Sequence, residues 1–140
     1  MPAVTQLRAV LDTNVYLSGL LFGGKPSDLI SRGLTGEFVI VSSLPILTEL
    51  REKLENRFGW RPSKVKDLFD SIIPAMEIVR VLGTLRAIPS DLDDNPILET
   101  AIVGGARYVV SGDKHILGLK EYENVQTITV DKFLTILSSA

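Results

Sequence analysis

Residues 6–14 read Gln6-Leu-Arg-Ala-Val-Leu-Asp12-Thr-Asn14, and the order of structural elements follows from them. A short apolar run that ends in turn-forming and helix-capping residues is typical of a buried strand followed at once by a helix. We therefore expect a strand over residues 6–12 and a helix over residues 15–21. Asp12 stands where this strand ends.

The rest of the chain repeats the same alternation. Further strands are predicted at residues 38–41, 77–82, 108–110 and 125–129. Helices are predicted at residues 27–34, 43–57, 63–73 and 96–104, and from about residue 131 onward. Ser27 is the expected cap of the first of these. Because no two strands have hairpin spacing, the pattern predicts a mainly parallel sheet of about five strands with helices on both faces. This is a doubly wound α/β fold, which we expect to form a single domain over residues 1–140.

Composition excludes several classes of protein. The 140 residues are 45% hydrophobic and 23% charged, which is ordinary for one globular domain and excludes a disordered chain. No run of about 18 apolar residues is present, so no membrane span is expected. No signal peptide is visible at the start, and the cytoplasm is the expected location. The net charge of −2 neither requires nor excludes nucleic acid.

The chemistry open to the chain is limited by its residue types. It has no cysteine and one histidine, His115. Disulfides, thiolate nucleophiles, iron–sulfur clusters and the usual zinc sites are therefore excluded. Catalysis must depend mainly on carboxylates, hydroxyls, lysines and backbone amides.

Four acidic residues are predicted to meet at one edge of the sheet. In open parallel sheets, functional groups lie beyond the carboxyl ends of the strands. Asp12 ends the first strand, Asp113 follows the strand at 108–110, and Asp94 opens the helix that leads back to that strand. Glu49 lies near the start of the helix that follows the second strand. These four acids can converge from distant positions in the sequence.

Clustered carboxylates need a cation. Each would raise the pKa of its neighbours unless positive charge compensated them. An all-oxygen set suits Mg²⁺ or Mn²⁺ rather than zinc. One or two such ions can activate water and stabilise the leaving oxygen during phosphodiester hydrolysis.

Each acid also has an ordinary structural interpretation. Asp12 can cap the following helix, and Asp113 can be a turn residue. Glu49 lies four residues before Lys53, the favoured order for a surface ion pair. Asp94 belongs to an acidic loop cluster with Asp91 and Asp93, which can serve capping and solubility. Chance rarely brings all four to one edge, so the joint pattern favours the metal site.

Other motifs are weaker. The stretch from Gly19 to Lys25 has the glycine spacing of a phosphate-binding loop, but Pro26 stands where Ser or Thr is needed, so a helix end and turn is expected. Arg57, Trp60 and Arg61, with Phe58, can stack bases and hold phosphates, or pack against the core or a partner. Lys25, Lys114 and His115 flank the proposed edge and can touch phosphates or remain solvated.

Together these segments resemble the PIN-domain nucleases, and among them the toxin-like members related to VapC. The resemblance covers nearly the whole chain. It is carried by the segment from Val10 to Leu20, by Ile46-Leu-Thr-Glu49-Leu, and by the segments from Asp91 to Leu98 and from Gly104 to Lys114. The first and last of these are the specific ones.

The resemblance implies a Rossmann-like three-layer α/β/α sandwich and an Mg²⁺- or Mn²⁺-dependent endoribonuclease. By this likeness Asp12, Glu49, Asp94 and Asp113 bind metal. Supporting roles fall to Asn14 and Ser111, which orient ligands or water, and Asp93 is a further candidate ligand. It also implies a homodimer and an antitoxin that covers the active-site groove. The sequence departs from similar chains at Leu92, where Pro is common, and at Ser111, where Thr is common.

Two alternatives remain open from the sequence. The first is a receiver-like or phosphatase-like Mg²⁺ enzyme with Asp12 as phosphoryl acceptor, although Asn14 stands where that class has a second acid. The second is a non-catalytic RNA-binding or regulatory module whose carboxylates hold a structural ion. RNA processing without a toxin role is a further option within the nuclease interpretation.

Overall fold

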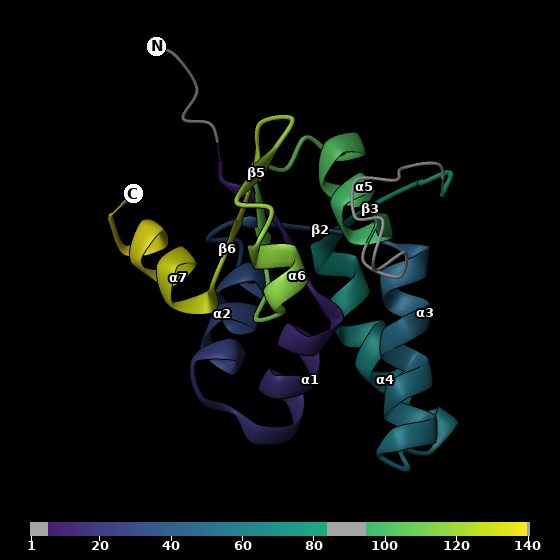
Figure 1. Ribbon diagram of the computed structural model, residues 1–140. Helices are drawn as coiled ribbons and strands as arrows, with labels where there is room; N and C mark the ends of the chain where they lie inside the picture. The colour runs from purple at the N-terminus through teal and green to yellow at the C-terminus, as the bar shows by residue number, and fades with distance from the viewer. Residues whose placement is uncertain (1–5, 84–94, 140) are drawn as a thin grey trace.

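A computed structural model describes residues 6–83 and 95–139 of the chain (Figure 1). Their centre is a six-stranded sheet with the order β3-β2-β1-β4-β6-β5. Five strands are parallel, and the short β5 pairs antiparallel with β6. The strands are β1 (Arg8–Leu11), β2 (Val39–Ser43), β3 (Met76–Val79), β4 (Tyr108–Val110), β5 (Glu121–Tyr122) and β6 (Val125–Ile128).

Helices connect the parallel strands, as the alternation of the sequence predicts. They are α1 (Thr13–Phe22), α2 (Gly24–Leu34), α3 (Leu44–Glu52), the π-helical turn η1 (Lys53–Arg57), α4 (Pro62–Ile72), the 3₁₀ turn η2 (Ile73–Ala75), α5 (Asn95–Val103), α6 (Lys114–Leu117) and α7 (Val130–Ser139). None of the helices in the described ranges is long and apolar enough to cross a membrane. The predicted α/β class with a mainly parallel sheet is confirmed.

Glycines allow helices to lie close against both faces of the sheet. A Cβ on Gly33 of α2 would lie 2.5 Å from Ile40 Cδ1, and a Cβ on Gly104, just after α5, would collide with Val41. Because neighbouring residues of a strand point to opposite faces, Ile40 and Val41 place α2 and α5 on opposite sides of β2. The arrangement is therefore layered, with the sheet between helices (Figure 1).

An aromatic cluster fixes α7 against the sheet. Phe133 is fully buried, and its ring lies 5.0 Å from that of Phe38 and 5.5 Å from that of Tyr108. The Phe38 pair is edge-to-face, the geometry that aromatic quadrupoles favour. This contact joins the last helix to β4 and to the residue before β2.

The structure corrects several predicted boundaries. Helix α2 begins at Gly24 and not at Ser27, because Gly23 and Gly24 adopt positive φ angles that let the chain turn directly from one helix into the next. The helix predicted at 43–57 is α-helical only to Glu52 and continues as the π turn η1. The third strand covers Met76–Val79 rather than 77–82. The strand β5 and the helix α6 were not predicted. They have two and four residues, respectively, which is too short for a periodic pattern of apolar residues.

The end of α1 matches the prediction for the glycine-rich stretch. The Gly23 N–H donates to the Gly19 carbonyl, and Gly23 has a φ of 75°. This is a helix end followed by a turn, and the stretch follows a helix rather than a strand. It is therefore not a phosphate-binding loop.

Candidate active site

The carboxyl ends of β1 and β4 lie side by side and carry two of the predicted acids. Leu11 pairs with Val110 as the last register position of the two strands, and the Asp12 N–H donates to the Val110 carbonyl at 3.0 Å. The Ser111 hydroxyl donates to Asp12 Oδ2 at 2.8 Å, and the Asp113 N–H donates to Ser111 Oγ at 2.9 Å. A chain of hydrogen bonds thus runs from Asp113 through Ser111 to Asp12.

Asp12 is a buried carboxylate with acidic neighbours. Its residue is 3% exposed. Burial raises the pKa of Asp12 above its ordinary value, the Ser111 hydrogen bond opposes that rise, and the Glu49 and Asp113 carboxylates add to it. Such a group gains from a cation beside it, because positive charge would offset both the desolvation and the repulsion.

Glu49 is held in place from two sides. Its Oε2 accepts a hydrogen bond from the Thr13 hydroxyl at 2.9 Å, and its Oε1 lies 3.0 Å from Lys53 Nζ. Thr13 is fully buried at the first position of α1, directly after Asp12. The ion pair with Lys53 is the ordinary role that the sequence offered for Glu49, and the structure contains it. The same carboxylate also raises the pKa of Asp12, so Glu49 is close enough to the end of β1 to act on that acid.

Asp113 caps a helix that the sequence did not predict. Its Oδ1 accepts from the backbone N–H groups of His115 and Ile116, at 2.7 and 3.3 Å, at the start of α6. Both bonds use the same oxygen, and Asp113 is half-buried. The carboxylate is therefore fixed in orientation by the backbone, which suits a ligand whose position must be constant.

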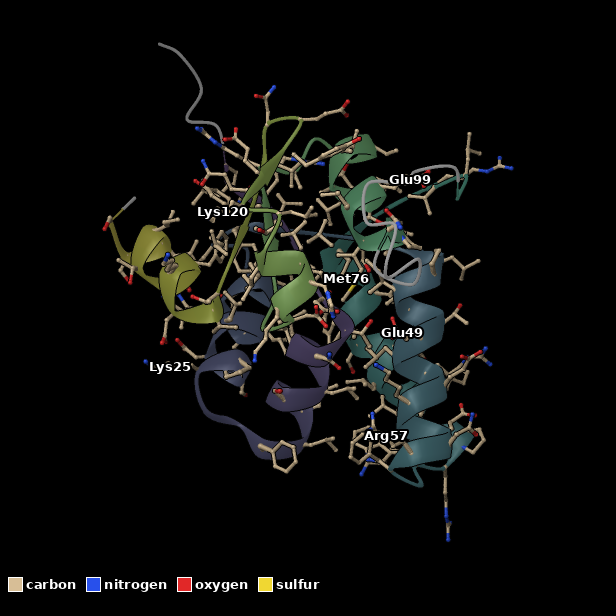
Figure 2. The ribbon with its side chains drawn as sticks, in the orientation of Figure 1. Lys25, Glu49, Arg57, Met76, Glu99 and Lys120 are labelled. Carbon is tan, nitrogen blue, oxygen red and sulfur yellow. The ribbon has the colours of Figure 1, made fainter. Side chains whose placement is uncertain are left out.

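A groove lies beside Glu49, between α3 and the end of β3. Its volume is about 840 Å³, and the lining residues are Leu44, Pro45, Thr48, Glu49, Glu52, Lys53, Val79, Arg80, Val81 and Pro96. The lining combines apolar side chains with two acidic and two basic ones. Figure 2 shows Glu49 on α3. A chain-like substrate laid in this groove would pass the Glu49 carboxylate.

Two predicted acids, Asp93 and Asp94, lie outside the described residues. Within the described ranges, no group of three or more acidic or histidine side chains lies close enough together to hold a metal ion by itself. The described edge therefore contributes Asp12, Glu49 and Asp113 as carboxylates that interact, and the predicted fourth acid precedes α5 in the sequence. Asn95, the first residue of α5, is buried.

Two residues with side-chain contacts between elements, Thr13 and Glu99, were not singled out from the sequence. Thr13 contacts Glu49, and its place in Asp12-Thr-Asn14 was the signal that could have identified it. Glu99 of α5 is 8% exposed, and its Oε2 accepts from the backbone N–H groups of Leu82 and Gly83, at 2.8 and 3.3 Å. A buried carboxylate thus ties α5 to the chain that follows β3. No spacing rule in the sequence indicates that contact.

The other predicted residues divide by location. Asn14 is exposed at the start of α1, and its Oδ1 lies 3.5 Å from Lys53 Nζ. Lys114 is exposed on α6, beside Asp113. Lys25 forms an exposed ion pair with Asp131 of α7 at 2.7 Å, so its charge is partly compensated there. Figure 2 shows Lys25 on the opposite side of the view from Glu49.

The basic and aromatic segment lies at the end of η1. Arg57 and Arg61 are exposed, whereas Trp60 is half-buried and packs against the core. Lys64 Nζ lies 3.9 Å from the centre of a Trp60 ring. A cation therefore covers one face of the indole, and stacking of a base on that face would first require Lys64 to move.

The donor set of the edge fits a hard divalent cation. All three described carboxylates offer oxygen, as do Asn14 and Ser111. The chain has no cysteine, and its one histidine, His115, contacts Asp113 through its backbone N–H. Mg²⁺ and Mn²⁺ prefer oxygen ligands. The buried Asp12, with two carboxylates acting on it, is the position that would gain most from such a charge.

Fold and site together define a class: a three-layer α/β protein with acidic residues at the carboxyl edge of a parallel sheet. A family model for the PIN domain matches residues 8–115 of the chain. The chain therefore belongs to the PIN-domain family, whose members are generally nucleases. The match includes Asp12, Glu49, Asp94 and Asp113. Among curated proteins, none matches the chain significantly.

Two solved structures have a similar fold. The first is VapBC2 from Rickettsia felis bound to a DNA fragment from its promoter, with a TM-score of 0.62, 16% identity, and coverage of 88% of this chain and 98% of that one. The second is PAE2754 from Pyrobaculum aerophilum, with a TM-score of 0.62, 13% identity, and coverage of 96% and 91%. At these identities the likeness concerns the fold, and it agrees with the α/β architecture described above.

Proposed function

We propose that this chain is a divalent-metal-dependent endoribonuclease that hydrolyses phosphodiester bonds of RNA, and the toxin of a toxin–antitoxin pair. The observation that carries the proposal is the buried Asp12 carboxylate, whose pKa is raised by burial and by Glu49 and Asp113 at the same sheet edge. Membership of a nuclease family supports hydrolysis. Family membership also favours hydrolysis over the alternative in which Asp12 accepts a phosphoryl group. The burial of Asp12 and its hydrogen bond to Ser111 also disfavour that alternative.

Each residue has a role in this proposal. Asp12, Glu49, Asp94 and Asp113 would hold one or two Mg²⁺ or Mn²⁺ ions, which when bound supply an activated water and stabilise the leaving oxygen. Ser111 and Thr13 orient Asp12 and Glu49 through the hydrogen bonds described above. Asn14, whose Oδ1 lies 3.5 Å from Lys53 Nζ, would orient ligands or water, and Asp93 would be a further ligand. Held in this way, the carboxylates keep their positions while the phosphodiester changes geometry.

RNA would lie along the groove beside Glu49 and contact basic residues around it. Arg57, Trp60, Arg61, Lys114 and, at greater distance, Lys25 are the proposed contacts. The apolar side chains that line the groove can pack against ribose or base surfaces, and its two basic side chains, Lys53 and Arg80, can meet the phosphates. Lys25 and Trp60 contribute least, because Asp131 and Lys64 already engage them.

The partners proposed for this protein are a second copy of the chain and an antitoxin. Support for the antitoxin comes from the fold that this chain shares with a chain of the VapBC2 structure. The proposal also treats residues 1–140 as one domain, since the six strands form a single sheet.

A cleavage assay tests the proposed activity. Purified protein is incubated with end-labelled single-stranded RNA, or with DNA of the same sequence, in Mg²⁺, Mn²⁺ or EDTA, and the fragments are separated on a gel. We expect metal-dependent cuts in RNA that Asp94→Asn and Asp113→Asn abolish. Asp70→Asn is the matched control, because Asp70 is an exposed acid paired with Lys66 on α4, and it should cut like wild type.

The result that contradicts the proposal is a folded wild type that binds Mn²⁺ and leaves several RNAs intact. RNA binding that survives loss of the acids, without cleavage, would instead favour the non-catalytic binding module. If only the DNA were cleaved, the protein would still be a nuclease, but RNA would be rejected as its substrate.

A further inference from the structure

One lysine reaches into the acidic edge. Lys53 Nζ lies 3.0 Å from Glu49 Oε1 and 3.5 Å from Asn14 Oδ1, so one ammonium contacts two of the residues assigned to the site. The Lys53 side chain is 27% exposed, and the residue also lines the groove beside α3. The positive charge therefore lies beside the Glu49 carboxylate, in the lining of the groove in which a substrate would be placed.

The backbone at Lys53 is unusual. Lys53 begins the π turn η1, and its carbonyl accepts from the N–H of Phe58, five residues later, at 3.2 Å. Single π turns are rare and are frequently found at functional sites. The helix that carries Glu49 thus changes its geometry at the residue that contacts Glu49.

We propose that Lys53 is a substrate-binding residue whose ammonium is held by Glu49 and Asn14 before the cation is bound and contacts a phosphate oxygen of the RNA afterwards. The inference rests on the proposed function. A divalent cation held by Glu49 would share the charge of this carboxylate with Lys53, so Glu49 would compensate the ammonium less, and the two positive charges would repel each other. The flexible stem lets the ammonium turn toward the nearest anion, which in a loaded groove is the phosphodiester.

The charges of the groove support this role. Glu49 and Glu52 both line it, and their carboxylates would repel an RNA backbone. Lys53 and Arg80 are the basic residues of the same wall. A phosphate in this groove therefore needs at least one of these cations, and Lys53 is the one already in contact with the carboxylate edge.

The competing explanation is an ordinary i,i+4 ion pair with no part in substrate binding. The chain contains a matched example: Lys66 lies 2.8 Å from Asp70 at the same spacing, with side chains 74% and 63% exposed, on α4 and outside the groove. Lys66→Gln removes the same charge from an i,i+4 pair in which the lysine precedes the acid and both side chains are more exposed. Any effect unique to Lys53→Gln therefore reports its location.

The test compares RNA affinity with and without a divalent cation. Fluorescence anisotropy of labelled single-stranded RNA is measured in EDTA and in Ca²⁺, an oxygen-seeking cation, for wild type, Lys53→Gln, Lys53→Arg and Lys66→Gln, and the RNA is checked for cleavage on a gel. Mn²⁺ affinity without RNA is measured by titration calorimetry. We expect Lys53→Gln to weaken RNA binding roughly 3- to 10-fold in Ca²⁺ and less than about 2-fold in EDTA, as for loss of one phosphate contact.

The same variant should bind Mn²⁺ as well as wild type or more tightly, because it removes a cation that competes for Glu49. Lys53→Arg should retain most of the RNA affinity, and Lys66→Gln should match wild type in every measurement. Equal RNA affinity of Lys53→Gln and wild type in Ca²⁺ would overturn the inference. So would weaker Mn²⁺ binding by Lys53→Gln, which would mean that Lys53 merely positions Glu49.

Failure of the proposed function has a different signature. A wild type that binds neither Mn²⁺ nor RNA would reject the metal-dependent ribonuclease, and this inference with it. A wild type that binds both, with Lys53→Gln indistinguishable from Lys66→Gln, rejects only the role of Lys53.

Discussion

The Ser111 hydroxyl donates a hydrogen bond of 2.8 Å to the Asp12 carboxylate, across 99 residues of sequence. Both side chains are buried, and each follows the end of a parallel strand. Since Ser111 also accepts from the Asp113 N–H, one hydroxyl orders two of the proposed metal ligands. Asp12 is therefore positioned by the sheet rather than by a loop, which is the rigid support that a catalytic group needs.

Replacing Ser111 with Ala should affect both stability and activity. It leaves a buried carboxylate and the Asp113 N–H without this partner, a loss of about 1–3 kcal/mol in the free energy of unfolding. The lost hydrogen bond also raises the pKa of Asp12 further, because that bond opposes the effect of burial. The acid limb of the pH–rate profile for RNA cleavage should then move to higher pH.

Ser111→Thr, which keeps the hydroxyl, is the control for this experiment. It should retain the wild-type acid limb. Denaturant unfolding and a pH–rate profile of the three proteins provide the measurements, and an unshifted limb in Ser111→Ala would show that Asp12 ionisation does not limit the reaction.

Asp12→Asn should stabilise the metal-free protein at neutral pH. The folded-state pKa of Asp12 is raised, so its contribution to stability is complete at low pH and is lost as the pH rises through the folded-state value. An uncharged Asn avoids that loss. We expect a Tm higher by about 3–6 °C at neutral pH in EDTA, the shift that roughly 1 kcal/mol gives in a domain of this size.

This gain should shrink on acidification, where wild-type Asp12 becomes protonated, and Mn²⁺ should stabilise wild type more than Asp12→Asn. Thermal unfolding at neutral and acidic pH, with EDTA or Mn²⁺, measures both effects. A variant that is less stable than wild type in neutral EDTA would contradict the burial argument.

Thr13→Val should weaken the metal site with little effect on the fold. Val has nearly the same shape as Thr but cannot donate to Glu49, which then keeps only Lys53 as a partner among the described contacts. Loss of a residue that orients a metal ligand typically costs 10- to 100-fold in affinity or activity, and we expect about 10-fold. Calorimetric Mn²⁺ titration of Thr13→Val and of Thr13→Ser, which keeps the hydroxyl, checks this; equal affinities would rule out a positioning role.

Phe133→Ala should destabilise the fold without acting directly on the site. The ring is fully buried against Phe38 and Tyr108, on the helix α7. Removing such a ring costs about 3–5 kcal/mol in the free energy of unfolding, and Phe133→Leu should cost less. Urea unfolding measures the difference, and a loss below about 1 kcal/mol for Phe133→Ala would mean that α7 is only loosely attached.

The order of strands and helices follows from the sequence because most elements carry a clear period. The apolar run before Asp12 and the alternation after it predict a parallel sheet, and the protein contains a sheet whose five longer strands are parallel. The antiparallel strand Glu121–Tyr122 was not predicted, because two residues are too few to show a period. A tight turn at Glu123 and Asn124, both at positive φ, brings these two residues back against β6. The start of α2 was predicted three residues too late, because the consecutive glycines indicate a turn and one of them, Gly24, is also the first residue of the helix.

The meeting of Asp12 and Asp113 at one edge of the sheet was predictable, because it depends on strand ends. Asp12 and Asp113 follow β1 and β4, and parallel strands bring such positions to one edge. The contacts that hold these acids were less predictable. The Thr13–Glu49 bond and the Glu99 contacts with the backbone at Leu82 and Gly83 depend on the packing of helices, which no short motif encodes.

The most direct test measures Mn²⁺ occupancy and RNA cleavage in the same buffer. Single-turnover cleavage rates of end-labelled RNA are plotted against the fraction of protein that calorimetry shows to be Mn²⁺-bound, for wild type and Asp12→Asn. The account predicts a wild-type rate that follows occupancy, and an Asp12→Asn variant that stays folded but loses both. Cleavage by an Asp12→Asn protein that binds no Mn²⁺, or a wild-type rate independent of occupancy, would contradict it.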